Sequence, residues 1–541
     1  MTVLDRPVDA LWAPKRAVHG RFARGLALGA ALAGLTLAAG GMRLFGAGRW
    51  SFWGDELVTY YDARMLRTTS YWNPEGYSSP HEKFIHACPL GFWLLGVWHD
   101  WVEPSELTAR LPLAAFATLG VVAAVAGVWR WRGPWVGIAL AVLLVPWPWG
   151  LFHAQNHRPY SIAWFLAVLG FLLVDDGFIR RRWAGLAAGA GCFLLAALSH
   201  STAAMVLPVL AAWIGWGALR SGAQRTAGHA LAGTLALAAL GLTVVLIRRF
   251  GGDFAGGSWW AMSPERCVAS LVNNMTWPVV LLALGGAGWT VAARRRDCYW
   301  LLLCSAAITG ACAVGPLVMS FRADYVFALT LPVHLLAAEA LAGIARPAWQ
   351  RHRLLGAAAL ATPVLLILPS VASYYVDGNR PDYRSAAAIL ADRASPGDVV
   401  WSDQCVNVRH YLPEPYAQPL PPRPVPATDE LLKQGRRVWC VLSYSTGGLA
   451  PHRLAWLSER FRWVADVHPL RFDYHQNGVA VFLADTPVAE TVAGRRAPCG
   501  VGVPGTARKL RPRGDQVGRE RWSIAEMLSD RAEARPPAIG N

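Results

Sequence analysis

Long apolar stretches, separated by short polar connections, occupy the first two thirds of the chain. Apolar runs close to the roughly 20 residues that a helix needs to cross a bilayer recur between residues 22 and 370. This pattern predicts about eleven membrane-spanning helices. We expect them near residues 24–46, 111–129, 134–152, 160–175, 183–199, 202–219, 229–247, 276–293, 299–319, 324–345 and 354–370.

The composition agrees with this pattern. Hydrophobic residues make up 54% of the 541-residue chain and charged residues only 16%, whereas soluble domains carry about 25% charged residues. The 27 tryptophans fit as well, because aromatic side chains favour the membrane–water interface. The sequence therefore predicts an all-α polytopic protein of the inner (plasma) membrane, surrounded by membrane lipids.

Positive charge gathers in every second connection between the apolar runs. It occurs in the N-terminal tail, 1–23, and in "WRWRG", "IRRRW", "RSGAQR", "ARRRD" and "RPAWQRHR". Because cytoplasmic loops carry an excess of Lys and Arg, these connections and the N-terminus are expected inside. The first outer loop, 48–110, and everything after residue 370 are then outside. Most of the net charge of +16 lies in these loops and in the tails, so it favours a topology signal and no nucleic-acid partner.

Two apolar segments need a separate interpretation. The run at 22–47 follows a basic tail, as a signal peptide does, but it is too long and lacks a clear cleavage site. We expect a retained first span. The segment "PLGFWLLGVWHDWV", 89–102, is too short to span and would disturb the charge alternation. It is expected as an interfacial helix on the outer face.

The character of the chain changes after residue 370. "RPDYRSAAAILADRASPGDVVWSD" is typical of a helix, a turn and a strand, "RRVWCVLSY" of a second strand, and "HRLAWLSERFR" of a further helix. "FDYHQNGVAVFLAD" resembles a hairpin that turns at Asn477 and Gly478. A small C-terminal extracytoplasmic α/β domain is therefore expected over 371–488. The Arg-, Pro- and Gly-rich stretch 489–541 is expected to be disordered.

The nine cysteines include no Cys-x-x-Cys pair. Cys192, Cys304 and Cys312 fall inside apolar runs and are expected to be packing residues. Cys405 and Cys440 could form a disulfide if their domain is extracytoplasmic, a question that spacing leaves open.

An acidic pair stands directly after the first span. Asp55 and Glu56 lie in "SFWGDELVTYYDAR", residues 51–64, at the start of the first outer loop. One interpretation is structural: the pair ends the helix in water. The other is functional, because ionisable groups at membrane depth are costly and are retained for function.

Three arginines break the charge rule at the outer ends of spans. They are Arg110 in "SELTARLP", Arg158 in "NHRPYS" and Arg322 in "FRADY", accompanied by Lys83, His153, His157 and His200. Taken singly, such long side chains could simply extend to the interface. Taken together with the acidic pair, they predict an outer cavity. It would suit an anionic lipid-linked substrate and a nucleophile that must lose a proton.

The order of these motifs resembles the GT-C glycosyltransferases, especially the protein O-mannosyltransferase and lipid A aminoarabinose transferase group. The matching pieces are "WGDELVTYYDAR", "PLGFWLLGVW", "SELTARLPLAAF", "HRPYSIAWFLAVLG", "LSHSTAAMVLP" and "FRADYVFALTLP", spread over roughly residues 20–370. The resemblance implies a GT-C-like fold with 24–370 as the catalytic membrane domain. It also implies transfer of a sugar from a polyprenyl-phosphate carrier to a lipid, glycan or protein acceptor on the outer face.

The resemblance further implies residue roles. Asp55 would be the catalytic base, with Glu56 beside it for the acceptor or for the architecture. Arg110, Arg158 and Arg322 would bind the donor phosphate or hold the loop.

Other candidates for substrate binding match the family's Arg-x-Tyr, His and Arg-Tyr signatures: Tyr160, His200 and Tyr325. The family's Pro-Pro-Leu is replaced here by Cys88-Pro89-Leu90. This leaves open whether Lys83 or His86 serves the phosphate.

Rival interpretations are weaker on the residues. The histidines of "HEKFIH" are five apart, which separates them by about 140° on a helix and disfavours a zinc-protease site. His153 and His157 have i,i+4 spacing and could share a metal, but no third ligand is clear; some GT-C members use a divalent cation, so metal dependence stays open. "FGGDFAGGSWW" lacks the Gly-Lys-Ser/Thr of a phosphate-binding loop.

Two other function classes fit these residues less well. A transporter or flippase for a lipid-linked or anionic solute would place polar groups near the midplane, often in inverted repeats, whereas here they gather at the outer ends. A non-catalytic assembly or sensory protein would leave the acidic pair at the membrane edge unexplained.

Overall fold

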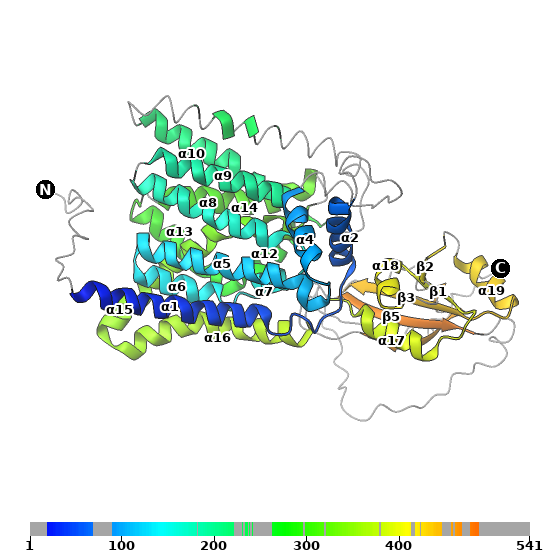
Figure 1. The fold of residues 1–541 in the computed structure, drawn as a ribbon. Helices are drawn as coiled ribbons and strands as arrows, with labels where there is room; N and C mark the ends of the chain where they lie inside the picture. Colours follow the sequence, from blue (N-terminus) through cyan, green and yellow to red (C-terminus); the bar gives the residue numbers. More distant parts are fainter. Residues whose placement is uncertain are drawn as a thin grey trace, which may run out of the picture.

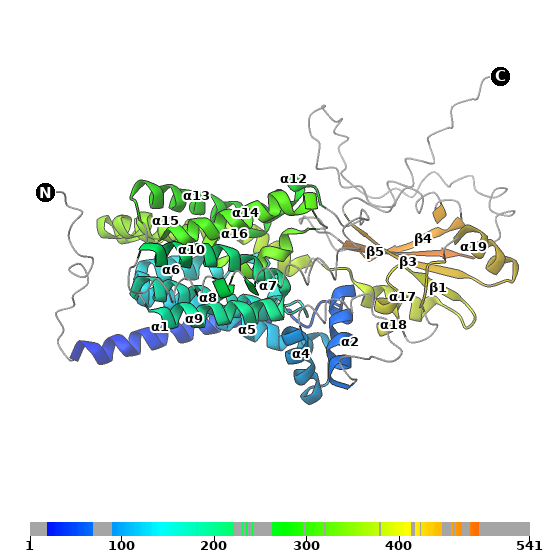
Figure 2. The ribbon, with the colours of Figure 1, turned by 90° about the horizontal axis from the view of Figure 1, so that it is seen from above.

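The protein is described by a computed structural model. The described residues are 19–68, 89–180, 182–220, 230, 233–235, 237–238, 241, 262–295, 298–318, 321–377, 380–412, 417–421, 424–445, 456–457, 460–467 and 477–485. Within them the chain forms a helical bundle and a smaller domain built on a β-sheet (Figures 1 and 2). Helices α2 (Gly54–Thr68) and α4 (Pro89–Trp101) lie at the end of the bundle that faces the sheet.

Long apolar helices make up the bundle. They are α1 (His19–Leu44), α5 (Glu106–Arg132), α6 (Pro134–Leu144), α7 (Pro148–Ala154), α8 (Tyr160–Arg180), α9 (Trp183–Ser199), η3 (Ser201–Met205), α10 (Val206–Arg220), α12 (Pro264–Met275), α13 (Trp277–Ala292), α14 (Tyr299–Val318), η6 (Ala323–Leu329), α15 (Leu331–Arg351) and α16 (Arg353–Asp377). Each expected span except that at 229–247 coincides with one or two of these helices, which confirms a polytopic α-helical fold. Most of 229–247 lies outside the described residues.

Four of the described helices are long and apolar enough to cross a membrane by themselves: α5, α8, α14 and α16. Three further pairs pass the same test together but bend sharply at a short break, which gives up to seven spans. The pairs are α6 with α7, bent by 66°, α12 with α13, bent by 95°, and η6 with α15, bent by 66°. The apolar segments in α1, α9 and η3–α10 are shorter. The sequence predicted none of the bends.

Proline marks the starts of several of these helices. Pro134, Pro148 and Pro264 occupy the first turn of α6, α7 and α12, where the missing N–H would have no partner in the helix anyway. Helix α5 begins differently, with a capping box in which the Ser105 and Thr108 side chains and backbone N–H groups bond reciprocally. These starts explain why uniformly apolar sequence divides into separate helices.

Polar side chains cross-link the end of the bundle furthest from the sheet. Arg132, in the last turn of α5, pairs with Asp175 of α8 at 2.5 Å and with Glu339 of α15 at 3.1 Å. Arg295 pairs with Glu339 at 2.8 Å. The connections that are expected to be cytoplasmic therefore meet at this end of the bundle. The arginines that break the charge rule, Arg110, Arg158 and Arg322, lie at the opposite end.

The smaller domain contains one five-stranded sheet in the order β2-β1-β3-β5-β4. The strands are β1 (Val399–Ser402), β2 (Ala417–Pro419), β3 (Val438–Ser445), β4 (Arg462–Asp466) and β5 (Asn477–Ala484). β1 pairs in parallel with β2 and β3, and β5 pairs antiparallel with β3 and β4. The expected α/β domain is thus present. The expected helix in "HRLAWLSERFR" lies largely outside the described residues.

Helices cover both faces of this sheet. α17 (Tyr383–Arg393) and α18 (Cys405–Tyr411) share one apolar cluster with the sheet, and α19 (Pro424–Lys433) shares the other. Cys405 packs in the first cluster and Cys440 in the second, so they lie on opposite faces of the sheet. The disulfide considered from the sequence is therefore excluded.

The hairpin turn expected at Asn477 and Gly478 within "FDYHQNGVAVFLAD" is wrong, and residues 472–476, its expected first strand, lie outside the described residues. Asn477 and Gly478 begin strand β5 and pair with Ser445 and Tyr444 of β3. The alternating apolar residues extend the strand back through the Asn-Gly dipeptide, because β3 supplies a partner for every one of its positions.

Candidate functional site

The acidic pair lies in the first turn of α2, at the junction of the bundle and the smaller domain. Gly54 is the first residue of this helix, so Asp55 and Glu56 stand at its positive end, where carboxylates are favourable. The structure gives the two neighbours opposite surroundings. The Glu56 side chain is fully buried, whereas the Asp55 side chain is 40% exposed.

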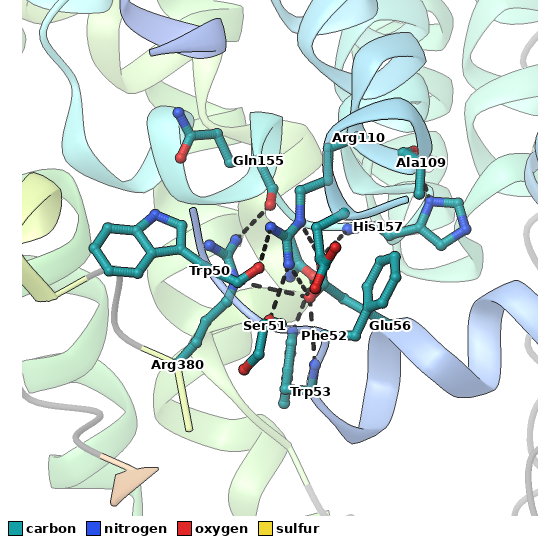
Figure 3. A network of polar contacts seen from close by, with 12 residues as sticks. Trp50, Ser51, Phe52, Trp53, Glu56, Ala109, Arg110, Gln155, His157 and Arg380 are labelled. Carbon is teal, nitrogen blue, oxygen red and sulfur yellow. Dashed lines mark hydrogen bonds and ion pairs between the residues drawn. The ribbon is translucent and has the colours of Figure 1, made fainter. Parts of the chain in front are cut away.

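Glu56 is held by a bidentate ion pair with Arg110 of α5 (Figure 3). Arg110 Nε donates to Glu56 Oε1 at 2.8 Å, and Nη2 donates to Oε2 at 2.6 Å. The His157 backbone N–H donates to Oε1 at 2.6 Å, and Arg380 Nε lies 3.9 Å from Oε2. Burial alone would raise the pKa of Glu56. The two guanidiniums and the hydrogen bonds outweigh burial and hold that pKa below its ordinary value.

Arg110 also fixes the loop that leads into α2. Its Nη1 donates to the carbonyls of Ala47 and Trp50, at 2.6 and 2.9 Å, and its Nη2 to that of Ser51, at 3.1 Å (Figure 3). The guanidinium is fully buried with its partners. Arg110 and Glu56 therefore hold the loop and the helix start, and neither is available to a ligand in this arrangement.

The smaller domain also binds the loop that leads into α2. Tyr411 Oη, from α18, accepts the Phe52 N–H at 2.6 Å and donates to Glu106 Oε1 at 3.0 Å. Ser51 Oγ donates to the carbonyl of Pro381 at 2.9 Å. Arg380 donates to the carbonyl of Phe152 in α7 and to that of Gln155 directly after this helix. The loop before Asp55 is thus clamped between two parts of the chain.

Asp55, unlike Glu56, has an arginine beside it but is not enclosed. Arg158 Nη2 lies 3.9 Å from Asp55 Oδ2, and Nη1 donates to Thr59 Oγ1 at 3.1 Å. Thr59 Oγ1 in turn donates to the Asp55 carbonyl at 2.8 Å. The carboxylate therefore has a nearby cation yet keeps oxygen surface open to solvent.

A second arginine completes a polar patch beside Asp55. Arg322 Nη2 pairs with Asp324 Oδ2 at 3.1 Å, and Trp149 Nε1 donates to Asp324 Oδ1 at 3.3 Å. Asp55 acts electrostatically on both Arg158 and Arg322, so the three groups share one region. Nε of Arg158 and Nε of Arg322 are buried and have no hydrogen-bond partner among the described residues.

Aromatic and imidazole rings form the floor next to these arginines. The Tyr160 ring contacts those of His153 and His200 in tilted arrangements, with centroids 4.5 and 4.1 Å away. Tyr160 and Tyr325 act electrostatically on both arginines. The structure therefore brings together the sequence candidates Asp55, Arg158, Tyr160, His200, Arg322 and Tyr325.

The histidines considered for a metal have different environments. His153 is buried among aromatic rings, whereas His157 Nδ1 contacts the Ala109 carbonyl at 2.8 Å and its Nε2 lies 3.2 Å from His99 Nε2. Over the described ranges, no three or more His, Cys, Asp or Glu side chains are placed to hold a metal ion. Lys83 and His86 lie outside the described residues.

Sequence reasoning missed two residues of this region. Arg380 is an arginine just after the last span, on the side expected to be outside, so the criterion that selected Arg110 could have found it. Asp324 stands two residues after Arg322 in "FRADY" and balances its charge.

Comparison with known proteins gives a fold. No protein-family model and no curated protein matches the chain. The crystal structure of ArnT from Cupriavidus metallidurans in the apo state matches with a TM-score of 0.53 and 13% identity, over 84% of this chain and 98% of that chain. The structure of the same protein bound to undecaprenyl phosphate has a TM-score of 0.49 and 15% identity, over 86% and 98%. This chain therefore has a GT-C-like fold with a C-terminal domain, as the resemblance implied.

Proposed function

We propose that this protein is a membrane glycosyltransferase that moves a sugar from a polyprenyl-phosphate carrier to a hydroxyl of a lipid, glycan or protein acceptor. The observation that carries the proposal is the surroundings of Asp55. It is a half-exposed carboxylate beside two arginines with unpaired nitrogens, at the mouth of a GT-C-like bundle. A base next to an anion-binding patch is what such a transfer requires.

In the proposed reaction the acceptor oxygen attacks the anomeric carbon of the donor sugar. The acceptor's proton passes to an Asp55 oxygen as the new carbon–oxygen bond forms. The bond from the anomeric carbon to the phosphate oxygen breaks, and its electron pair stays on the phosphate. Cations beside the departing phosphate stabilise the charge that grows on it.

Arg158 and Arg322 are the proposed phosphate ligands. Each has a buried Nε without a hydrogen-bond partner among the described residues, and buried donors are normally satisfied. A phosphate oxygen would satisfy them through charge-assisted hydrogen bonds. Tyr160, Tyr325 and His200 line the same region and are proposed to contact the donor.

The resemblance left open whether Glu56 and Arg110 bind substrate or hold the architecture. Their contacts favour the structural role. Their bidentate pair is fully buried and already occupies both carboxylate oxygens. We assign them to holding the loop and the start of α2, which orients Asp55.

The test is a reconstitution with labelled polyprenyl-phospho-sugars that compares the wild type with Asp55→Asn. Loss of the base should lower the transfer rate by at least about a hundredfold, the lower scale of general-base catalysis. Asp100→Asn, at an exposed position near the end of α4, is the matched control and should transfer at the wild-type rate. An unchanged rate in folded Asp55→Asn would remove Asp55 from the mechanism. Repeating the assay with a chelator tests whether a divalent metal takes part.

A further inference from the structure

Helix α18 of the smaller domain lies directly against the start of α2 (Figures 1 and 2). A Cβ placed on Gly54 would come within 3.0 Å of Gln404 Oε1 and 3.6 Å of Asn407 Nδ2. The polar tips of two amide side chains therefore approach the residue that precedes Asp55. Glycine at this position is what allows them to come so close.

This contact is fixed by neighbours on the same helix. Tyr411 bonds to the Phe52 N–H and to Glu106, and the His410 ring packs edge-on against Phe52 with centroids 5.5 Å apart. Because α18 is tied to Phe52 in the loop before α2 and to Glu106 at the start of α5, the fold fixes its position beside the start of α2.

The Gln404 side chain is free to bind. It is partly exposed, and over the described part of the chain its amide makes no hydrogen bond, while its backbone N–H is taken up by Ser402 Oγ. An amide offers both a donor and an acceptor, the combination that a sugar or lipid hydroxyl pairs with. Asn407, by contrast, is buried beside Gly54.

The geometry of displacement puts the acceptor on this side. In an in-line reaction the attacking hydroxyl approaches opposite the departing phosphate, with its base beside it. Arg158 lies 3.9 Å from a carboxylate oxygen of Asp55, whereas the amide tips of Gln404 and Asn407 on α18 approach Gly54, one residue before it. An acceptor that reaches Asp55 away from the arginines therefore meets α18.

We propose that α18 forms a wall of the acceptor site and that Gln404 is a specificity-determining residue for a hydroxyl-bearing acceptor. The inference rests on the proposed function, which supplies the reaction and the role of Asp55. It gives the smaller domain a direct part in choosing what receives the sugar.

The test measures how the enzyme divides a labelled polyprenyl-phospho-sugar between two nucleophiles. Methyl glucoside serves as the hydroxyl probe and water as the competitor. Gln404→Ala should lower the ratio of transfer to hydrolysis about five- to tenfold, the scale of one hydrogen bond. Gln404→Glu, which keeps the size of the side chain but loses the N–H donors, should lower the same ratio and replaces the first variant if that fails to fold.

The ratio of transfer to hydrolysis distinguishes a loss of acceptor specificity from a general loss of activity. A merely structural effect lowers both products in proportion, so an unchanged ratio in either folded variant overturns the role of Gln404. Gln434→Ala, at an exposed position just after α19, is the matched control and should keep the wild-type ratio. A wild-type protein that consumes none of the donors would instead overturn the proposed function, and this inference with it.

Discussion

Asp55 and Glu56 are neighbours of the same charge, and burial alone gives them different tasks. An isolated charge inside a protein is strongly unfavourable, so Glu56 requires the Arg110 guanidinium. Glu56→Gln keeps the shape of the side chain but leaves Arg110 uncompensated. We expect it to destabilise the fold by about 3–5 kcal/mol, the usual cost of breaking a buried pair. Thermal unfolding in detergent measures the loss.

The control for this substitution is Glu103→Gln, at an exposed position in the connection after α4. An exposed carboxylate contributes about 0–1 kcal/mol at most, so this variant should unfold close to the wild-type temperature. Equal unfolding temperatures for the two variants would contradict the structural role of Glu56.

His157 gives the protein a pH dependence of stability. Burial, reinforced by His99, lowers the pKa of His157 from 6.5 to about 3 in the folded state. Between these values the unfolded chain binds the proton and the folded chain does not. Stability is therefore fully present above pH 6.5 and declines as the pH falls toward about 3.

His157→Gln should flatten this decline, because the variant has no proton to gain on unfolding at this position. Unfolding temperatures recorded at stepwise pH measure the slope. His352→Gln, at an exposed position just before α16, should keep the wild-type slope. A steep slope that survives in His157→Gln would assign the dependence to other groups.

At the scale of elements, helices α13 and α15 approach through glycine. A Cβ on Gly286 would lie 2.0 Å from the Leu336 carbonyl oxygen, whereas one on Gly288 of the same helix would meet nothing within 4 Å. Small residues allow such close backbone contact between helices in a membrane. Gly286→Ala should therefore force the helices apart and cost about 1–3 kcal/mol or more, while Gly288→Ala should be neutral. Comparing the unfolding temperatures of the two variants checks this, and equal values would refute the close contact.

The elements also show what a sequence can predict. Apolar length located the spans, because the bilayer's thickness fixes how many residues a spanning helix needs. Length alone could not locate the bend between α12 and α13, where the break at Thr276 comes directly before Pro278 in the first turn of α13. The charge rule found Arg110 and Arg158. It could not say that Arg110 has carboxylate and carbonyl partners within the fold, whereas Nε of Arg158 has no hydrogen-bond partner among the described residues. Pairing geometry decides that, as it decides that Cys405 and Cys440 lie on opposite faces.

At the scale of the whole molecule, α1 begins at the end of the bundle furthest from the sheet, and basic connections gather there (Figure 1). The positive-inside rule then predicts that this end is cytoplasmic and that the smaller domain is on the opposite side. Asp392→Cys on α17 and Arg351→Cys at the end of α15 are both exposed and report on the two ends.

In a background without the native cysteines, a membrane-impermeant maleimide added to right-side-out vesicles should label Asp392→Cys and spare Arg351→Cys. Inside-out vesicles should give the reverse pattern, which serves as the internal control. The site around Asp55 lies at the end that carries the smaller domain, so the labelling also decides which leaflet can deliver a lipid-linked donor. Labelling of Arg351→Cys in right-side-out vesicles would show that the orientation is the reverse of the predicted one. The proposed reaction would then take place on the cytoplasmic face.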